Sequence, residues 1–299
     1  MATGKQGEHG RTAQAVPPTR HELRQRHRGK ARRDFRQPQP KTTQDARWSV
    51  ARRGICCNCC DDDLRPPVFF QVMRADTQGG AIGVVMSPDG SSWSCERIDL
   101  AEPFHVSYPY VFEWQADVYI IPETGEARAV RLYRARALPF EREFVGELLA
   151  DEHFVDASVF RLERHWWKLT EVSPVSDDGR TNTRHGTLRL YGASNLEGPW
   201  IEHPMSPVVT NDAKVARPAG RVVRTEQRLV RFAQDCSQDC GFSVPAFEIQ
   251  ELSPATYRER PLGEMPILGP CRYSWDSGVM HHVDAHFVEG QWVTSVDGW

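Results

Sequence analysis

The sequence has no long hydrophobic run. None of its 299 residues lie in a stretch of about 18 uncharged apolar residues, the length that crosses a membrane. It also lacks the apolar core of a signal peptide after Met1, and no amphipathic helix longer than two turns is evident. These absences exclude integral membrane proteins, coiled coils and collagen. We therefore expect no transmembrane segment, and the cytoplasm is slightly favoured as the location.

Acidic residues are scarce only at the start of the chain. Residues 1–50 hold 12 Lys and Arg but 4 Asp and Glu, whereas the whole chain has a net charge of −3. A basic arm on an acidic body can contact nucleic acid or another anionic surface. A segment this poor in apolar residues is more simply interpreted as a disordered leader. We predict a disordered basic arm over residues 1–45 and expect no nucleic-acid partner.

The cysteines lack the spacing of a metal site. Four of the eight crowd into residues 56–60, with no second pair or suitable histidine after them. Cys236 and Cys240 could pair in an oxidising compartment, but without an export signal free thiols are favoured. The sequence predicts an irregular, Cys-rich junction over residues 46–79, and no metal or cofactor.

From residue 80 onward, short segments rich in Val, Tyr, Phe and Trp alternate with turn residues, which predicts strands. Residues 111–121 align without gaps on 159–169, and both read as strand, turn, strand. Residues 131–138 match 189–196 in the same way. Repeats of roughly four strands are typical of propeller blades, whereas a two-sheet sandwich, the alternative, would not repeat in this way. We therefore predict one all-β propeller domain over residues 80–299 rather than two domains.

The same region resembles a known family. The segments that carry the resemblance are residues 102–114, 121–124, 216–221, 232–235 and 280–284. They resemble the N-terminal domain of glucosamine inositolphosphorylceramide transferase and its bacterial relatives. This implies a five-bladed β-propeller similar to those of glycoside hydrolase family 43. In the plant proteins the domain precedes a separate transferase domain that adds an amino sugar to a sphingolipid, and we expect no such domain in this chain.

The chain departs from the family pattern in its first blade. Family members begin that blade with an Ala-Asp-Pro-Phe strand, and nothing in residues 46–80 matches it. Either residues 46–78 supply the missing strands in altered form, or the first blade is incomplete.

Four polar residues occupy matching places ahead of Pro or Ala in the predicted hairpins: Tyr108, Asp156, Arg217 and Asp284. The innermost strands of a propeller line its central channel, so we expect the four to converge at one mouth. Two carboxylates, a guanidinium and a phenol can bind sugar hydroxyls or a phosphate. The alternative is that Arg217 only neutralises the two carboxylates within an internal ion network.

The related hydrolases imply a catalytic reading of some of these positions. In them, the first blade supplies the general base, a second Asp tunes a pKa, and a Glu is the acid. The resemblance puts Asp156 at the tuning position and Glu123 nearest to the acid, while the base position is empty. Asp284 is the remaining carboxylate that could act with Glu123. An acid alone cannot activate water, so hydrolysis is the weaker interpretation.

Further residues are expected to border the same mouth. His282, Asp284 and His286 share one face of a predicted strand, from which His281 points away. They could bind zinc, but a hydrogen-bonding row is favoured. The predicted substrate-binding residues are His105, Tyr108, Arg217, Arg221, Gln234, Asp235 and His282.

The sequence thus predicts a propeller that handles carbohydrate or a glycolipid, as an accessory or substrate-recognition domain of a glycosyltransferase-type system. The expected ligand is a carbohydrate, a sugar phosphate or a glycolipid headgroup, and the expected protein partner is a separate or fused transferase domain. A glycoside hydrolase acting by paired carboxylates and a non-catalytic interaction scaffold remain the alternatives.

Overall fold

The computed structural model describes only the later part of the chain, and the predicted arm and the Cys56–Cys60 cluster lie outside the described residues. All described residues belong to the unit that spans residues 48–299. No helix among them is long and apolar enough to cross a membrane. The described ranges are 67–73, 79–87, 92, 94–137, 141–173, 186–238, 241–264, 266–270, 277–288 and 291–298.

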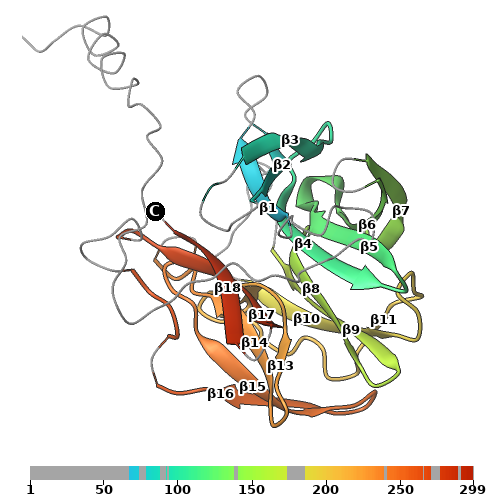
Figure 1. The fold of residues 1–299 in the computed structure, drawn as a ribbon. Coiled ribbons are helices and arrows are strands. Elements are labelled where there is room, and N and C mark those ends of the chain that lie inside the picture. Colours follow the sequence, from blue (N-terminus) through green and yellow to red (C-terminus); the bar gives the residue numbers. More distant parts are fainter. Residues whose placement is uncertain are drawn as a thin grey trace, which may run out of the picture. The chain divides into compact units, whose positions relative to one another are not determined.

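The described strands form five antiparallel sheets that follow one another along the chain (Figure 1). The first sheet contains β1 (Val68–Met73), β2 (Gly80–Met86) and β3 (Ser94–Leu100). The second contains β4 (Ser107–Trp114), β5 (Asp117–Glu123), β6 (Ala129–Ala137) and β7 (Glu141–Ala150). The 3-10 helix η1 (Gly125–Ala127) joins β5 to β6.

The third and fourth sheets repeat this meander with shorter outer strands, whereas the fifth has two described strands. The third sheet contains β8 (Phe154–Leu162), β9 (His165–Val172), β10 (Thr187–Ala193) and β11 (Ile201–Glu202). The fourth contains β12 (Arg217–Pro218), β13 (Val223–Arg224), β14 (Leu229–Gln234), β15 (Ala246–Leu252) and β16 (Tyr257–Pro261), and the fifth contains β17 (Met280–Val288) and β18 (Gln291–Gly298).

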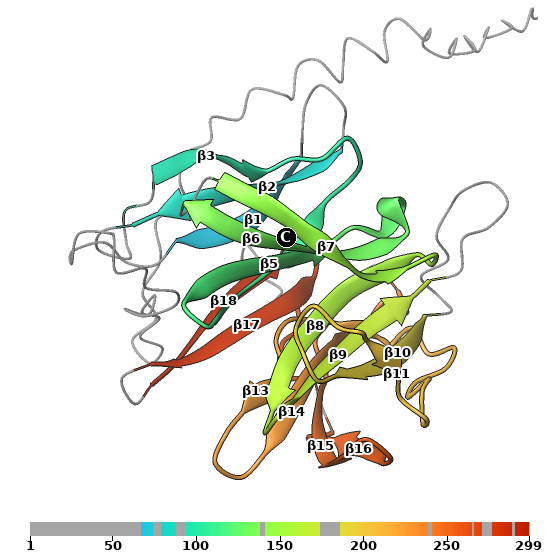
Figure 2. The ribbon, with the colours of Figure 1, turned by 90° about the vertical axis from the view of Figure 1, so that its right-hand side faces the viewer.

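Each sheet packs face to face on the next through apolar side chains that alternate along its strands. In β5, Ile120 faces the first sheet and Ile121 faces the third, because successive strand side chains point to opposite faces. Four clusters of buried residues join the first sheet to the second, the second to the third, the third to the fourth and the fourth to the fifth. Figure 2 shows the successive sheets from the side. Serial face-to-face packing of small meanders is the architecture of a β-propeller. The predicted fold class is confirmed, whereas the number of blades stays a prediction.

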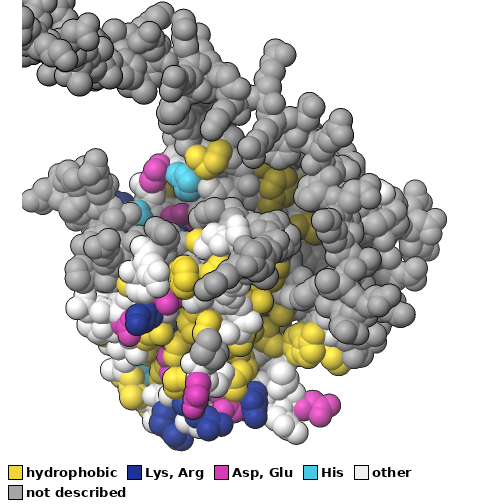
Figure 3. All heavy atoms as spheres, turned by 90° about the vertical axis from the view of Figure 1, so that its left-hand side faces the viewer, with side chains coloured by type: hydrophobic (Ala, Val, Ile, Leu, Met, Phe, Trp, Pro, Cys, Tyr) yellow, Lys and Arg dark blue, Asp and Glu magenta, His cyan; other side chains and the backbone are white. Residues whose placement is uncertain are grey.

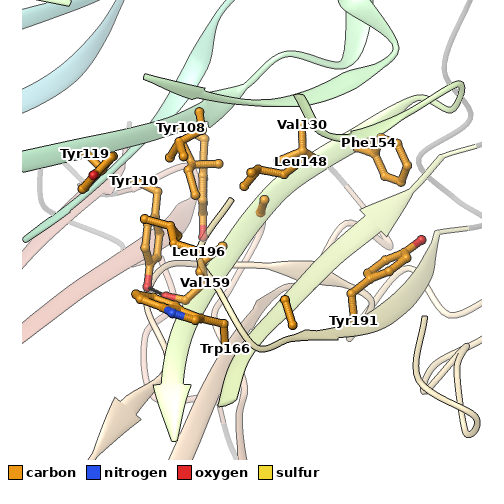
Figure 4. Packing of buried hydrophobic residues seen from close by; sticks show 14 residues of the cluster. Tyr108, Tyr110, Tyr119, Val130, Leu148, Phe154, Val159, Trp166, Tyr191 and Leu196 are labelled. Carbon is orange, nitrogen blue, oxygen red and sulfur yellow. Dashed lines mark hydrogen bonds between the residues drawn. The ribbon is translucent and has the colours of Figure 1, made fainter. Parts of the chain in front are cut away.

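The cluster between the second and third sheets is the most aromatic. Trp114 meets Trp166 edge to face, with ring centroids 4.9 Å apart. The Tyr110 hydroxyl donates a hydrogen bond to the carbonyl of Val159, which ties β4 to β8 (Figure 4). The cluster therefore fixes the relative position of the two innermost strands.

Charged pairs cover the outer strands of the fourth sheet. Arg258 and Arg260 of β16 lie 2.6 Å from Glu251 and Glu248 of β15, respectively. The side of the molecule on which these strands lie shows apolar side chains near its centre and a band of charged side chains along its lower edge (Figure 3). Such exposed pairs contribute little to stability.

The first sheet differs from the expectation. Residues 46–79 were expected to form an irregular junction, but they contain β1, which pairs with β2 from Val68 to Met73. The segment is short, follows two prolines and reads as one apolar run rather than an alternation, so its period of two is hidden. The first sheet therefore begins at Val68 rather than at residue 80.

Candidate functional site

A cavity of about 200 Å³ lies where the first and fifth sheets face each other beside the innermost strands of the other sheets. Among the described residues, none of the four apolar clusters joins these two sheets. The cavity is lined by Val68, Phe69, Phe70, Gln71, Ser107, Tyr108, Pro109, Asp156, Arg217, Gln234, His281, His282, Asp284, Ser295, Val296 and Asp297.

Tyr108 and Asp156 reach the cavity through the same local distortion. Residue pairing slips between Ser107 and Tyr110 in the β4–β5 hairpin, and between Val155 and Ser158 in the β8–β9 hairpin. At these bulges Tyr108 has a φ of 46° and Asp156 a φ of 47°. A positive φ is costly for residues other than glycine and is concentrated at functional sites. The two residues are thus structural equivalents, 48 positions apart.

Asp156 is the centre of a buried polar group. Its side chain is 2% exposed, and its Oδ2 accepts hydrogen bonds from Arg217 Nε at 2.6 Å and Gln234 Nε2 at 2.7 Å. Arg217 itself pairs with Gln234 across β12 and β14, and Gln234 also donates to the Pro218 carbonyl. Because burying a carboxylate is costly unless it is paired, Arg217 and Gln234 compensate for the burial of Asp156.

Tyr108 lines the cavity and is hydrogen-bonded to two other sheets. Its hydroxyl accepts a hydrogen bond from Gly220 N at 2.8 Å and lies 3.0 Å from Ser158 Oγ. Ser158 in turn donates to the Gly220 carbonyl at 2.6 Å. Burial, and then the nearby charge of Asp156, raise the pKa of Tyr108 well above its usual value. The phenol is therefore a neutral hydrogen-bonding group that joins the second, third and fourth sheets.

Asp284 is held in a second ion pair. Arg221 Nε donates to Asp284 Oδ1, and His286 Nε2 lies 3.2 Å from Oδ2. Burial alone would raise the pKa of Asp284, but the charge of Arg221 and the hydrogen bond from His286 hold this pKa well below its usual range. Arg221 also donates to the Val111 carbonyl at 3.1 Å, so it links the fifth sheet to the second. Asp156 and Asp284 are thus paired with different arginines.

The histidines at the start of β17 differ from the expectation. Pairing between β17 and β18 slips from Met280 to His282, and this bulge brings both His281 and His282 to the cavity. His282 packs edge to face on Tyr108, with ring centroids 5.1 Å apart, and His281 Nδ1 lies 2.9 Å from Asp297 Oδ1. The strict alternation that points His281 away is broken by the extra residue.

Four predicted site residues do not line the cavity. Glu123 accepts hydrogen bonds from Ser107 Oγ at 2.6 Å and Gly125 N at 2.8 Å. His105 Nδ1 accepts from Gly80 N, which fixes the start of β2. Asp235 accepts from the backbone N–H and hydroxyl of Ser237 within a turn. Arg221 is engaged by Asp284 and Val111, as described above.

Sequence reasoning missed the part of the wall formed by β1 and β18. β1 was assigned to the junction, and residues 295–297 carried no motif. Among the residues that the structure describes, no group of three or more His, Cys, Asp or Glu side chains could hold a metal ion. Cys236 is buried, and Cys240 lies outside the described part of the chain.

Comparison with solved structures supports the fold. A sucrose-6-phosphate hydrolase from Lactobacillus gasseri is 11% identical with a TM-score of 0.54, covering 83% of this chain and 52% of that one. A GH32 β-fructofuranosidase from Bombyx mori is 14% identical with a TM-score of 0.51, covering 76% and 50%. At these identities the similarity concerns the propeller fold alone.

Comparison of sequences reveals the family. The model of "Glucosamine inositolphosphorylceramide transferase 1, N-terminal" matches residues 61–299. The transferase of that name from Oryza sativa subsp. japonica is 34% identical over 240 residues, which cover 77% of this chain and 31% of the relative. The Arabidopsis thaliana protein is 27% identical over 235 residues, covering 77% and 30%. The chain thus spans about a third of the length of these curated relatives. The resemblance found in the sequence is confirmed, and the chain belongs to the family of the N-terminal domain of glucosamine inositolphosphorylceramide transferase 1.

Proposed function

We propose that this propeller binds one sugar unit of a glycolipid headgroup in the cavity and presents it to a glycosyltransferase. The observation that carries the proposal is the convergence of Tyr108, Asp156, Arg217 and Asp284 on one polar cavity. Ligand cavities for drug-sized molecules measure about 300–1,000 Å³. A cavity of about 200 Å³ suits a single sugar ring better than an oligosaccharide.

The polar groups of the cavity match the groups of a sugar. Carboxylate oxygens accept hydrogen bonds from hydroxyls. The Tyr108 hydroxyl is engaged by Gly220 and Ser158, so this residue contributes its ring to the wall. Three carboxylates line the cavity, of which Asp156 and Asp284 are each paired with an arginine and Asp297 lies beside His281. Neither arginine is thus left without a carboxylate partner. This balance favours a neutral or amine-bearing sugar over a phosphate. It agrees with the amino sugar in the name of the related transferases.

Hydrolysis is the less favoured alternative. An inverting glycosidase needs an acid and a base about 6.5–9.5 Å apart on either side of the bond. The charge of Arg221 holds the pKa of Asp284 well below its usual range, so Asp284 cannot donate a proton to a leaving group. The Oδ2 atom of Asp156 is occupied by hydrogen bonds from Arg217 and Gln234. Glu123 does not line the cavity, and the segment of β1 that does, residues 68–71, offers no carboxylate. These features support binding rather than bond cleavage.

A protein-interaction scaffold with an inert channel is also less favoured. Such a scaffold would be expected to have an apolar mouth, whereas Asp156, Arg217 and Gln234 form a buried polar group in this cavity. The curated relatives are about three times as long as the matched segment. We assign the transfer step to a transferase domain, fused to the propeller or separate from it. The propeller would then recognise the substrate.

Binding to the full chain tests the proposal. Saturation-transfer NMR and calorimetry with D-glucosamine and with myo-inositol 1-phosphate should detect binding of at least one probe. Asp156→Asn should weaken it about tenfold or more, because Arg217 and Gln234 lose the charge that orients them. Asp117→Asn, at an exposed carboxylate, is the matched control and should leave binding unchanged.

Two outcomes contradict the proposal. One is that neither probe binds to the wild-type chain. The other is that the wild type releases sugar from arabinosides, xylosides or fructosides and that Glu123→Gln abolishes this release, since the domain would then be a hydrolase.

A further inference from the structure

The inner strand of the first sheet gives the cavity a second kind of wall. β1 has Val68, Phe70 and Val72 on one face and Phe69 on the other. Phe69 packs on the cluster between the first and second sheets. The Cζ atom of Arg142 lies over the Phe69 ring, 5.2 Å from the ring centroid. Phe70 faces the other way, is half-buried, and belongs to none of the four apolar clusters of the described residues.

Gly83 sets the position of the Phe70 ring. The two residues are paired across β1 and β2, so a side chain at 83 would share the face on which Phe70 lies. A Cβ there would lie 3.1 Å from Phe70 Cζ and 3.0 Å from Val72 Cγ1. The ring therefore leans over β2 in space that only glycine leaves open. This arrangement fixes an aromatic ring in the cavity wall without help from the apolar core.

The cavity is consequently two-sided. The wall from the first sheet is mostly apolar and consists of Val68, Phe69, Phe70 and Gln71, while Asp156, Arg217 and His282 are among the polar residues that line the cavity from the other sheets. A pyranose has the same division, with hydroxyls around its rim and C–H groups on its faces. An aromatic face carries partial negative charge and attracts C–H groups that neighbouring oxygens make positive.

We propose that Phe70 is a stacking platform for the C–H face of a pyranose, and that it makes the cavity selective for a closed sugar ring over an open-chain polyol. The inference rests on the proposed function and names the class of ligand at the same site. The polar wall alone would hold any flexible molecule with enough hydroxyls. The aromatic wall adds a requirement for a flat, rigid array of C–H groups.

The experiment pairs two ligands with two variants in the full chain. The ligands are D-glucosamine, a ring in solution, and 2-amino-2-deoxy-D-glucitol, which has the same amine but no ring. The wild type should bind the ring about three- to tenfold more tightly, the range expected for an aromatic contact beyond simple burial. Phe70→Leu, which keeps an apolar side chain, should remove this preference. Phe287→Leu, at an aromatic residue that is 62% exposed and not in the cavity wall, should keep it.

A second measurement needs no substitution at Phe70. Irradiation of the aromatic protons of the wild type should saturate the ring C–H protons of bound D-glucosamine. Gly83→Ala should weaken this transfer, because the added methyl group displaces the Phe70 ring by a few tenths of an ångström.

The outcomes separate the two proposals. If the wild type binds D-glucosamine but Phe70→Leu retains both affinity and ring preference, the stacking platform is wrong and the sugar-binding function stands. If the wild type binds both ligands equally, the ring selectivity is wrong. If it binds neither these ligands nor myo-inositol 1-phosphate, the sugar-binding function fails, and this inference fails with it.

Discussion

The β4–β5 and β8–β9 hairpins share a backbone but differ in chemistry. They have the same bulge, the same positive φ at the cavity and the same pairing of the inner strand with a glutamate, Glu123 in one and Glu171 in the other. At equivalent places, however, one hairpin presents Tyr108 and the other Asp156. The same holds in the core, where Ile120 pairs with Val111 and Lys168 pairs with Val159. The repeat therefore conserves geometry, and single substitutions within it create the site.

Of the two equivalent residues Tyr108 and Asp156, the aspartate is expected to show the larger loss of stability when it is substituted. Asp156→Ala leaves the Arg217 guanidinium and the Gln234 amide without their shared acceptor. Breaking a buried ion pair from one side costs about 3–5 kcal/mol. Urea unfolding should show this loss, while Asp117→Ala at an exposed pair should lose at most about 1 kcal/mol. Equal losses in the two variants would contradict the central role of Asp156.

A substitution at Tyr108 should reduce the stability less than one at Asp156. Tyr108→Phe keeps the ring but leaves Gly220 N without its hydroxyl acceptor and removes the contact with Ser158. A buried donor left unpaired costs about 1–3 kcal/mol. Thermal unfolding of the variant checks this value. Stability equal to that of the wild type would mean that the backbone at Gly220 finds another partner.

A single substitution can give the equivalent core positions Ile120 and Lys168 the same residue. Lys168 is fully buried with no hydrogen-bond partner among the described residues, and its Nζ lies 4.1 Å from the centroid of the Trp200 ring. Lys168→Ile gives the third sheet the residue that the second has at Ile120. We expect the variant to unfold at a higher denaturant concentration. Its free energy of unfolding should be about 1–2 kcal/mol larger, because an unpaired buried amine is costly. Ile120→Lys is the reverse test and should destabilise.

The same lysine predicts a pH dependence. Burial lowers the pKa of Lys168 well below its usual value, so near pH 10 the unfolded chain binds a proton that the folded chain does not. The free energy of unfolding contributed by this group should therefore rise as the pH approaches the unfolded pKa of about 10.4. Measuring the free energy of unfolding of the wild type and of Lys168→Ile from pH 8 to 10 isolates this contribution. The variant's advantage in stability should become smaller as the pH rises.

The smallest effect is expected at Glu123. Glu123→Gln retains one oxygen that can accept from Ser107 or Gly125, and the side chain does not line the cavity. Affinity for D-glucosamine should stay within about twofold of the wild type, since surface substitutions change free energies by about 0.5 kcal/mol or less. A marked loss measured by calorimetry would place Glu123 in the binding site.

The sequence revealed what depends on local periodicity. The 48-residue repeat located both hairpins, and with them Tyr108 and Asp156. It hid what depends on irregularity or on contacts between sheets. A bulge turned His281 into the cavity, and an apolar run behind two prolines concealed β1 and Phe70. The pairing of Asp284 with Arg221 rather than Arg217 depends on how distant strands meet, which no spacing encodes.

The network of Tyr108, Ser158 and Gly220 has a consequence for the path of a ligand. Gly220 also packs so closely on the Val283 backbone that a side chain there would overlap it, and Val283 N donates to the Ala219 carbonyl at 2.7 Å. Segments from four sheets thus meet next to Tyr108, in the wall of the cavity. Under the proposed function, we therefore expect the terminal unit of a glycan to bind and the internal residues of a long polysaccharide to be ignored.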